Sequence, residues 1–555
     1  MLKTKEQAAG PSIAAPPAAA PAAEIRVYNT LTKAKQPLAP VTPGHVGIYL
    51  CGPTVYKPSH IGHMVGPVIF DAIKRYLAYN GYRVTLVINV TDVDDKLIAE
   101  SREHGVPMAD LAAAMTADYM INPQAMGIDT VDHFPRATDN IDEIIRFTEE
   151  LIARGFAYAA DGDVYFDVAK DADYGKLSHR SLESLQGEGG EMAGRKRSPA
   201  DFALWKSAKP GEPSWDSPWG AGRPGWHIEC SAMSRRLLGK TFDIHGGGLD
   251  LVFPHHENEV AQSECCHGRP MANIWMHNGL MQSSHEVGKL GGRATRESAD
   301  GAINEGDQAA QEAGKMGKSK GASPFSELLK RFQPETIRFF LLSTHYRRPI
   351  DFSEEQILDK YKGLEQFYRF FGRYERVMAH AEKEKWRTFH DIVPQSRRGA
   401  GDETAAGDPA AGDTLRQEIL AQREKFLAAM DDDFNTGGAI GELFDLLRSL
   451  NKLADGEKLE SPTADAAKRA TFRWGSAVLR ELTATLGLFR RPPPQTGGGG
   501  NDKLAGEVIA VLIDVRNEAR KAKNFALSDR IRNTLAEHGV LLEDRLEGTI
   551  WSLQK

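Results

Sequence analysis

The sequence predicts an α/β protein with a doubly wound parallel sheet, followed by a mainly helical C-terminal third. Strand-like and helix-like apolar patterns alternate from residue 25 to about residue 131, and the pattern resumes at Pro224. The run RVTLVINV at 83–90 has the continuous apolar character of a parallel strand that is covered on both faces. Beyond residue 414, apolar residues recur at helical spacing. An insertion therefore splits the α/β domain, and helices follow it.

The chain divides where its composition changes. After residue 131, a helical stretch and the strand-like GDVYFDV give way to loops rich in Gly and Pro, which is typical of an inserted domain. Low-complexity sequence marks an insert and two linkers. The predicted parts are a disordered tail at 1–23, the first α/β half at 24–131, the inserted domain at 132–223, the second α/β half at 224–325 with a low-complexity insert at 283–314, a helical region at 326–396, a linker at 397–413, a helical domain at 414–491, a linker at 492–500 and a small, mainly helical module at 501–555.

Composition indicates a cytoplasmic protein of three or four domains. The 555 residues are 41% hydrophobic, which is enough for buried cores, and the net charge of −7 argues against a generally basic nucleic-acid binder. Four cysteines are too few for a disulfide framework in a chain of this length, so reduced thiols or metal ligands are expected. No apolar run predicts a membrane span, and the Ala- and Pro-rich start lacks the apolar centre of a secretory signal.

The first α/β half carries a candidate phosphate site. The apolar run at 46–50 predicts a strand, which leads through Gly52 to His60 and His63 at the start of a helix. Free backbone N–H groups and the positive end of a helix dipole favour phosphate at such a turn, which suggests a Rossmann-like, nucleotide-binding fold. Far down the chain, KMGKS at 315–319 offers two lysines. Taken alone, each motif is more often ordinary solvated surface.

Four residues form a candidate metal site. His255 and Glu259 are four residues apart, so on a helix they share one face. Cys51 ends a predicted strand in the first half, and Cys230 lies near the start of the second half. If the halves form one sheet, two thiolates, an imidazole and a carboxylate converge, a set that suits zinc. The alternative is two buried cysteines and a surface His/Glu pair, since no CxxC pair is present.

Several long motifs in order resemble the cysteinyl-tRNA synthetases, a family of class I aminoacyl-tRNA synthetases. They are CGPTVYKPSHIGH, NVTDVDDK, ADFALWK, PGWHIECSAMS, FDIHGGGLDLVFPHHENEVAQSE, WMHNG, DDDFNTGGAI and RNEARKAKNFALSDRIRNTLAEHGVLLEDRLEGTIW. The resemblance runs from about Ile25 to the C-terminus. It implies a class I Rossmann-like catalytic domain with an inserted connective domain, a stem-contacting region, a helical tRNA-binding domain and a C-terminal anticodon-recognition module.

The resemblance implies that the four candidate ligands hold one Zn²⁺, which binds the thiolate of the substrate L-cysteine and so rejects serine without an editing site. The reaction it implies has two steps: ATP activates cysteine as the adenylate, and the adenylate acylates the terminal adenosine of tRNA(Cys), first at the 2′-hydroxyl. His60, His63, Lys315 and Lys318 would contact the phosphates together with Mg²⁺. The remaining expected contacts are Gly247 and Asp250 for ATP, and Cys51, Gly52, Thr91, Trp226 and His245 for cysteine.

A local basic surface is expected in the last module. Arg516, Arg520 and Lys523 fall at i, i+4 and i+7, so we expect one helical face that suits RNA phosphates, although a solvated helix with internal ion pairs fits the charges equally well. The resemblance assigns this module to the anticodon, where Trp551 would stack on a base or pack in the core. We expect a monomer that does not bind membranes.

The sequence departs from the family pattern at two places. Gly317 replaces the serine of the usual KMSKS loop, and the insert at 283–314 replaces a short connection.

Two other functions are possible for such a chain. One alternative is a related ligase that transfers activated cysteine to an amino-sugar, but such relatives lack the long C-terminal region. The other is an RNA-binding protein with a decayed active site, which the intact histidines, lysines and candidate ligands argue against.

Overall fold

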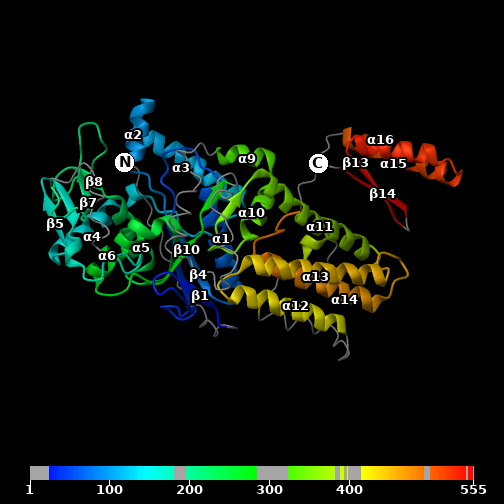
Figure 1. Cartoon of the computed structure of the whole chain (residues 1–555), viewed down its shortest axis with the longest axis horizontal. Helices are drawn as coiled ribbons and strands as arrows, with labels where there is room; N and C mark the ends of the chain where they lie inside the picture. The colour runs from blue at the N-terminus through cyan, green and yellow to red at the C-terminus, as the bar shows by residue number, and fades with distance from the viewer. Residues whose placement is uncertain are drawn as a thin grey trace, which may run out of the picture. The chain divides into compact units, whose positions relative to one another are not determined.

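A four-stranded parallel sheet carries the centre of the molecule. The computed structural model describes residues 24–180, 195–283, 323–381, 388–392, 397, 414–492, 501–545 and 548–553. The sheet has the order β10-β9-β3-β4, and every neighbouring pair is parallel. Its strands are β3 (His45–Leu50), β4 (Arg83–Ile88), β9 (Phe242–Gly248) and β10 (Ala272–Asn278). The predicted α/β class is confirmed (Figure 1).

The strand order reverses between β3 and β9. Helix α1 (Gly62–Tyr79) follows β3 and leads to β4, whereas α6 (Glu257–His267) follows β9 and leads to β10. Helix α5 (Trp226–Leu238) precedes β9. In open α/β sheets, ligands bind outside the carboxyl ends of the strands at such a switch point. The residues after β3 and at the end of β9 are therefore placed to form a site.

The insertion between the two halves of the sheet folds as its own layer. Strands β5 to β8 form an antiparallel sheet in chain order, with α4 (Ile141–Ala153) packed on it. Their bounds are β5 Ala157–Ala160, β6 Asp163–Phe166, β7 Phe202–Ser207 and β8 Gly222–Pro224. Phe147, Phe166 and Trp205 are buried in its core, which also includes residues of α5 and α6. The inserted layer is thus joined to the second half of the α/β domain.

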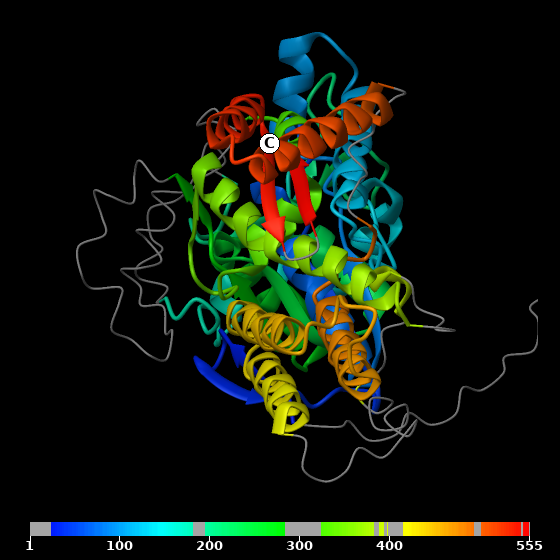
Figure 2. The ribbon, with the colours of Figure 1, turned by 90° about the vertical axis from the view of Figure 1, so that its right-hand side faces the viewer.

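Long helices pack against the other side of the sheet domain (Figures 1 and 2). Helices α12 and α13 lie side by side, and α14 packs on both. Aromatic and aliphatic residues of this group continue the core around α1 without a break. The bounds are α10 Pro334–Leu342, α11 Glu354–Met378, α12 Thr414–Asp431, α13 Thr436–Gly456 and α14 Ala466–Thr485.

Shorter elements complete the described part of this unit. They are β1 Arg26–Asn29, β2 Ala34–Pro37, α2 Asp95–His104, α3 Met108–Ala125, the 3₁₀ helices Ala137–Asn140, Val168–Lys170, Leu249–Leu251 and Phe389–Asp391, the π-helix Val252–His256, β11 Met281–Ser283, α9 Phe325–Arg331 and β12 Ile350–Phe352. None of the helices in the described ranges is long and apolar enough to cross a membrane.

Residues Arg491–Lys555 form a second compact unit. It contains α15 (Asn501–Lys521), α16 (Phe525–Glu537) and an antiparallel hairpin of β13 (Val540–Arg545) and β14 (Gly548–Leu553). Ile509, Ile513, Leu535 and Val540 form its small buried core. The hairpin is an addition to the helical module that the sequence predicted.

Two sequence interpretations need correction in this part of the fold. The strand predicted at 83–90 ends at Ile88. The glycines of HGGG, expected in a turn, are the last three residues of β9, because β9 pairs with β10 as far as Gly248. The tail at 1–23, the insert and most of both linkers lie outside the described residues.

Candidate active site

The four candidate metal ligands converge at the switch point of the sheet. Cys51 directly follows β3, and Cys230 lies in α5. His255 comes from the π-helix after β9, and Glu259 from the start of α6. Cys51 Sγ lies 3.7 Å from Cys230 Sγ, 3.6 Å from His255 Nε2 and 3.5 Å from Glu259 Oε1, and the last two atoms are 3.0 Å apart. This arrangement can hold a metal ion.

His256 is a rival ligand that the sequence did not suggest. Its ligand atom lies with those of Cys51, His255 and Glu259 in one group that spans less than 4.8 Å. However, His256 Nδ1 is bonded to His277 Nε2 at 2.7 Å, and its Nε2 lies 4.0 Å from Glu259 Oε1. Cys230 is not in that group, but its Sγ lies 3.7 Å from Cys51 Sγ, whereas the His256 ring is already bonded to His277. The predicted set therefore remains the better candidate.

A second layer of side chains orients these groups. His245 Nε2 lies 2.9 Å from Glu259 Oε2, and the His245 ring stacks on Trp275 with 4.3 Å between centroids. His227 Nδ1 lies 3.1 Å from His255 Nδ1. Such contacts fix the orientation of a ligating imidazole or carboxylate. His245 was predicted to contact cysteine, whereas His227 was not assigned a role, although it lies in the quoted motif PGWHIECSAMS.

The electrostatics of the cluster keep Glu259 ionised and His255 protonated. Burial opposes ionisation of Glu259, but His245 and His255 outweigh it and hold the pKa of Glu259 at about 2. Burial would lower the pKa of His255, yet Glu259 raises it to about 10. Burial raises the pKa of Cys51, whereas the hydrogen bond from Cys51 helps to lower that of Cys230 to about 6. Zn²⁺ would therefore have to displace the protons of His255 and Cys51 before it binds these groups.

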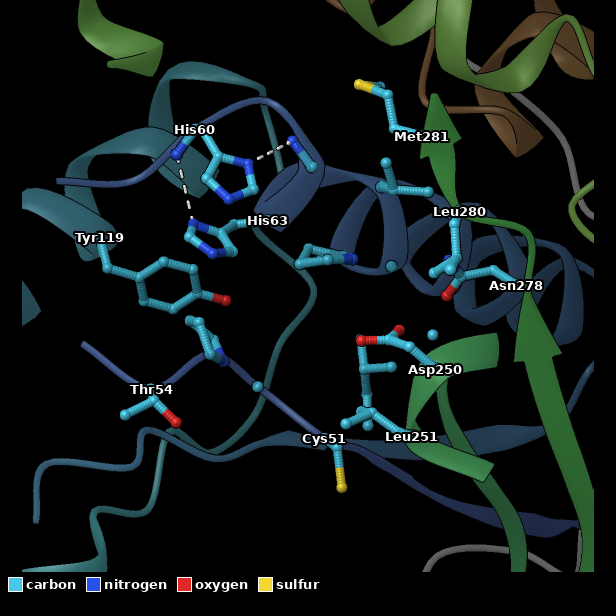
Figure 3. A pocket seen from close by; sticks show the side chains of 18 of the residues that line it. Cys51, Thr54, His60, His63, Tyr119, Asp250, Leu251, Asn278, Leu280 and Met281 are labelled. Carbon is cyan, nitrogen blue, oxygen red and sulfur yellow. Dashed lines mark hydrogen bonds between the residues drawn. The ribbon is translucent and has the colours of Figure 1, made fainter. Parts of the chain in front are cut away.

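A pocket of about 510 Å³ opens directly beside the cluster (Figure 3). Cys51 belongs to both, since it lines the pocket and carries one of the four donor atoms. His60 and His63 lie on one wall and Asp250 on another, and Tyr119 lies across from Asp250. The full lining is Leu50–Thr54, Tyr56, His60, Gly62, His63, Val65–Pro67, Lys96, Tyr119, Trp226, Gly248, Asp250, Leu251 and Asn278–Met281.

His60 and His63 lie at the N-terminus of α1, as the sequence predicted. Their rings stack with 3.9 Å between centroids. The backbone N–H of His60 donates to His63 Nδ1 at 3.3 Å, and that of Gly62 donates to His60 Nδ1 at 3.1 Å (Figure 3). Both rings thus lie beside the positive end of the helix dipole, a position that favours phosphate.

The glycine expected to contact ATP is displaced by one position. A Cβ on Gly247 would meet His256 Cε1 at 2.5 Å, so Gly247 faces the protein interior. Gly248 lines the pocket, and its Cβ would lie 2.4 Å from Asp250 Oδ1. Asp250 itself lines the pocket as predicted. Gly248, rather than Gly247, therefore permits close approach beside Asp250.

The predicted cysteine contacts fall into two groups. Cys51, Gly52 and Trp226 line the pocket, and the Trp226 ring stacks on that of His255 with 4.3 Å between centroids. A Cβ on Gly52 would lie 1.7 Å from the Asn89 carbonyl oxygen, so no other residue fits there. Thr91 and His245 are buried and do not line the pocket. His245 lies within β9, and Thr91 follows the end of β4.

Comparison with known proteins identifies the family. A family model described as "tRNA synthetases class I (C) catalytic domain" matches residues 37–289 and 307–362, and a DALR domain matches 425–490. The chain is 43% identical to a cysteine–tRNA ligase of Geobacter sulfurreducens, over 96% of this chain and all of that protein. It is also 43% identical to one of Symbiobacterium thermophilum, over 95% and 99%. The chain belongs to the cysteine–tRNA ligase family.

Solved structures agree at the level of the fold. A Mycobacterium tuberculosis methionyl-tRNA synthetase in complex with methionyl-adenylate superposes with a TM-score of 0.55 and 16% identity, over 84% of this chain and 94% of that one. The resemblance inferred from the motifs and the class I fold are thus confirmed. The catalytic-domain match is interrupted between residues 289 and 307, within the insert predicted from the sequence.

Lys315 and Lys318 lie outside the described residues, so their predicted contacts with ATP stay predictions. The same holds for the effect of Gly317. The described pocket also contains three basic or titratable groups that sequence reasoning did not assign, Tyr56, Lys96 and Tyr119. Lys96 lies in the quoted motif NVTDVDDK, where its position next to an acidic run gave no sign of a pocket.

The predicted tRNA contacts of the second unit do not form one exposed face. Arg516 is buried and donates to both carboxylate oxygens of Asp544 at 2.7 Å. Arg520 also donates to Asp544 at 2.7 Å, and its side chain is 47% exposed. Lys523 lies beyond the end of α15 with a φ of 58°. Trp551 is 37% exposed. Arg516 therefore stabilises the module, and the RNA contacts predicted for Arg520, Lys523 and Trp551 stay predictions.

Proposed function

We propose that the chain activates L-cysteine with ATP and transfers it to the 3′-terminal adenosine of tRNA(Cys), and that Cys51, Cys230, His255 and Glu259 hold the zinc ion that selects cysteine. One observation carries this proposal: the four donor groups converge beside a pocket that also contains His60, His63 and Asp250. Groups for the thiol, the phosphates and the ribose thus line a single cavity.

The donor distances support zinc. Zinc bonds of about 2.3 Å to sulfur and about 2.0–2.2 Å to nitrogen or oxygen give tetrahedral edges of about 3.3–3.8 Å. The three distances from Cys51 Sγ, 3.5–3.7 Å, fall in this range. His255 and Glu259 are closer, at 3.0 Å, because a hydrogen bond joins them. When bound, zinc would keep the substrate sulfur as a thiolate, which the harder and less acidic hydroxyl of serine cannot replace.

The residues of the chain then position the reactants. Trp226 and Cys51 bound the amino-acid end of the pocket, and Gly248 allows adenosine to approach Asp250, which accepts hydrogen bonds from ribose hydroxyls. His60 and His63 donate to the phosphate oxygens as the cysteine carboxylate attacks the α-phosphate and pyrophosphate leaves. Lys315, Lys318 and Mg²⁺ would share the charge of the leaving group. The barrier falls through positioning and charge stabilisation.

The two competing functions make different predictions. A ligase for an amino-sugar acceptor needs the catalytic domain alone, whereas this chain matches a DALR domain and aligns with cysteine–tRNA ligases over their whole length. A decayed binding protein would keep RNA contacts and lose the convergence of donors. Cysteine-dependent ATP–pyrophosphate exchange separates enzyme from binder. Charging of tRNA(Cys), tested against an amino-sugar acceptor, separates the two enzymes.

The Cys230→Ser variant tests the metal assignment. We expect cysteine affinity to fall at least tenfold, because a hydroxyl is a poor zinc ligand at this position, while ATP affinity stays within about twofold. Cys265→Ser in α6 is the matched control, since Cys265 is outside the cluster, and it should leave both affinities unchanged. Isothermal titration of each full-length variant gives both constants. Wild-type cysteine affinity in a folded, ATP-binding Cys230→Ser protein would contradict the assignment.

A further inference from the structure

A second cluster of metal-ligand type lies away from the pocket, where the inserted layer meets α6. Glu150 of α4 and Cys266 and His267 at the end of α6 place their ligand atoms within 4.8 Å of one another. Cys266 Sγ lies 3.3 Å from Glu150 Oε2. None of the three residues lines the pocket or belongs to the candidate active site.

His267 supplies the observation that points to a ligand. Both of its ring nitrogens are buried, and neither has a hydrogen-bond partner among the described residues. The ring is held by an edge contact with Phe147, with 5.3 Å between centroids. Burial and Arg235 hold the pKa of His267 at about 4, so the ring is neutral near pH 7 and keeps a lone pair. Buried polar atoms are almost always paired, so an imidazole with two orphaned nitrogens requires a partner.

The charges around the cluster can accommodate a divalent cation. Arg235 Nη1 lies 3.0 Å from Glu150 Oε2 and 4.0 Å from Cys266 Sγ, so Glu150 must release Arg235 before it binds an ion. Burial and Glu150 raise the pKa of Cys266 to about 12, so the ion must also displace the thiol proton. Arg235 also pairs with Glu143 at 2.8 Å, and it keeps that partner if Glu150 turns away. A carboxylate, a thiolate and a neutral imidazole carry a charge of −2, which a divalent ion neutralises. The loaded site would therefore not repel Arg235 strongly.

We propose that Glu150, Cys266 and His267 form a second Zn²⁺ site, which joins the inserted layer to α6. Sulfur, nitrogen and oxygen donors in a set of three suit zinc, with water in the fourth position. The present spread of up to 4.8 Å exceeds tetrahedral edges of about 3.3–3.8 Å. The Glu150 side chain is 45% exposed, so it can rotate to close this gap and the ion can enter from solvent.

Metal stoichiometry of the full-length protein tests the proposal. The chelated wild type, titrated with Zn²⁺ against a chromophoric competitor, should take up two equivalents. Cys266→Ala and His267→Gln should take up one, as should Cys230→Ser, while Cys230→Ser/Cys266→Ala takes up none. Cys265→Ala is the matched control: it alters the neighbouring cysteine of the same helix and should still bind two equivalents. The active-site assignment can fail in this assay without affecting the second site.

A spectroscopic titration keeps the test decisive if a variant does not fold. Co²⁺ added to the chelated wild type should produce thiolate charge-transfer absorption in two steps. The step from the second site should be about half as intense as that from the first, because Cys266 gives one thiolate bond and Cys51 with Cys230 gives two. Equal metal uptake by the wild type and by folded Cys266→Ala, or lower uptake by folded Cys265→Ala than by the wild type, would overturn the proposal.

Discussion

At the scale of single residues, Gly248 and Asp250 lie in contact on the pocket lining, where we propose that ATP binds. Gly248 is the last residue of β9 and lines the pocket. A Cβ on either of the two glycines before it would clash with Phe70 or His256. A side chain at this position has no free space, because Asp250 Oδ1 occupies it. We therefore expect Gly248, rather than Gly247, to contact ATP.

Gly248→Ala should weaken ATP binding. The new Cβ would lie 2.4 Å from Asp250 Oδ1, so the Asp250 side chain must turn away from the ribose. We expect the KM for ATP to rise about tenfold, with cysteine affinity unchanged. The matched control is Gly47→Ala in β3, where every neighbour stays at 3.5 Å or more. An unchanged KM for ATP in steady-state exchange assays would exclude Asp250 from ribose binding.

The sequence predicted the residues whose chemistry is tied to a motif, and it missed those that depend on packing. Cys51, Cys230, His255 and Glu259 converge as expected. Residue spacing alone could not place them, since the convergence depends on β3 lying beside β9. His227, His256 and His277 were missed because a histidine within an apolar motif gives no sign of which neighbour its ring will meet. The sequence could not show that Arg516 pairs with Asp544, because Asp544 lies 28 residues away in the hairpin.

At the scale of elements, α1 connects the active site to the helical domain. Its N-terminus carries His60 and His63, and its later turns carry polar groups that bond to the helical domain. Tyr79 and Arg423 share Glu481, while the buried Asp71 pairs with Arg75 and Arg338. Buried groups of this kind are costly when one partner is lost. The position of His60 and His63 is therefore coupled to helices far away in the sequence.

Asp71→Asn should destabilise the first unit. It keeps the shape of the side chain but leaves the Arg338 guanidinium buried beside a neutral amide, so the free energy of unfolding should fall by about 3 kcal/mol. Urea unfolding followed by far-UV circular dichroism measures the change. Asp445→Asn breaks an exposed pair with Arg448 and should change stability by less than about 0.5 kcal/mol. Equal free energies of unfolding for the two variants would show that the buried pair does not stabilise the fold.

The hairpin of the second unit should loosen in acid. Hydrogen bonds from Arg516 hold the pKa of Asp544 well below its ordinary value of 3.8. A lowered folded pKa means that the stabilisation is complete above about pH 4 and is lost as the pH falls below that value. Asp544 is 40% exposed, so the effect should stay below about 1 kcal/mol.

Amide-exchange protection factors in α15 at pH 6 and pH 3 measure this loss. They should differ in the wild type, and Asp544→Asn should abolish the difference. Asp514→Asn, on the same helix, is the control and should keep it. A wild-type module with equal protection at both pH values would contradict the role of the Asp544 pair.

At the scale of the whole molecule, the chain consists of two compact units that divide between Arg490 and Arg491. All described residues of the candidate active site belong to the first unit, whose core runs without a break from the sheet to α14. The second unit has its own small core. Sequence composition predicted a tether at 492–500, close to this division. It could not predict the hairpin, whose strands are short and partly polar.

Deletion of residues 501–555 should separate the two half-reactions. We expect ATP–pyrophosphate exchange within about twofold of wild type, because the pocket and its supports remain. Charging of tRNA(Cys) should fall at least tenfold in kcat/KM, since the proposed anticodon contacts are lost. Initial rates of both reactions on the same preparation give the comparison. Unchanged charging by the truncated chain would count against an anticodon role for this unit.

The most direct test of the central claim is amino-acid selection with and without metal. Full-length protein is assayed for ATP–pyrophosphate exchange with cysteine and with serine, before chelation, after chelation, and after Zn²⁺ is restored. We predict that cysteine-dependent exchange is lost on chelation and regained with Zn²⁺, while serine supports little exchange in any state. A chelated protein, shown by metal analysis to lack zinc, that still prefers cysteine to serine would contradict the account.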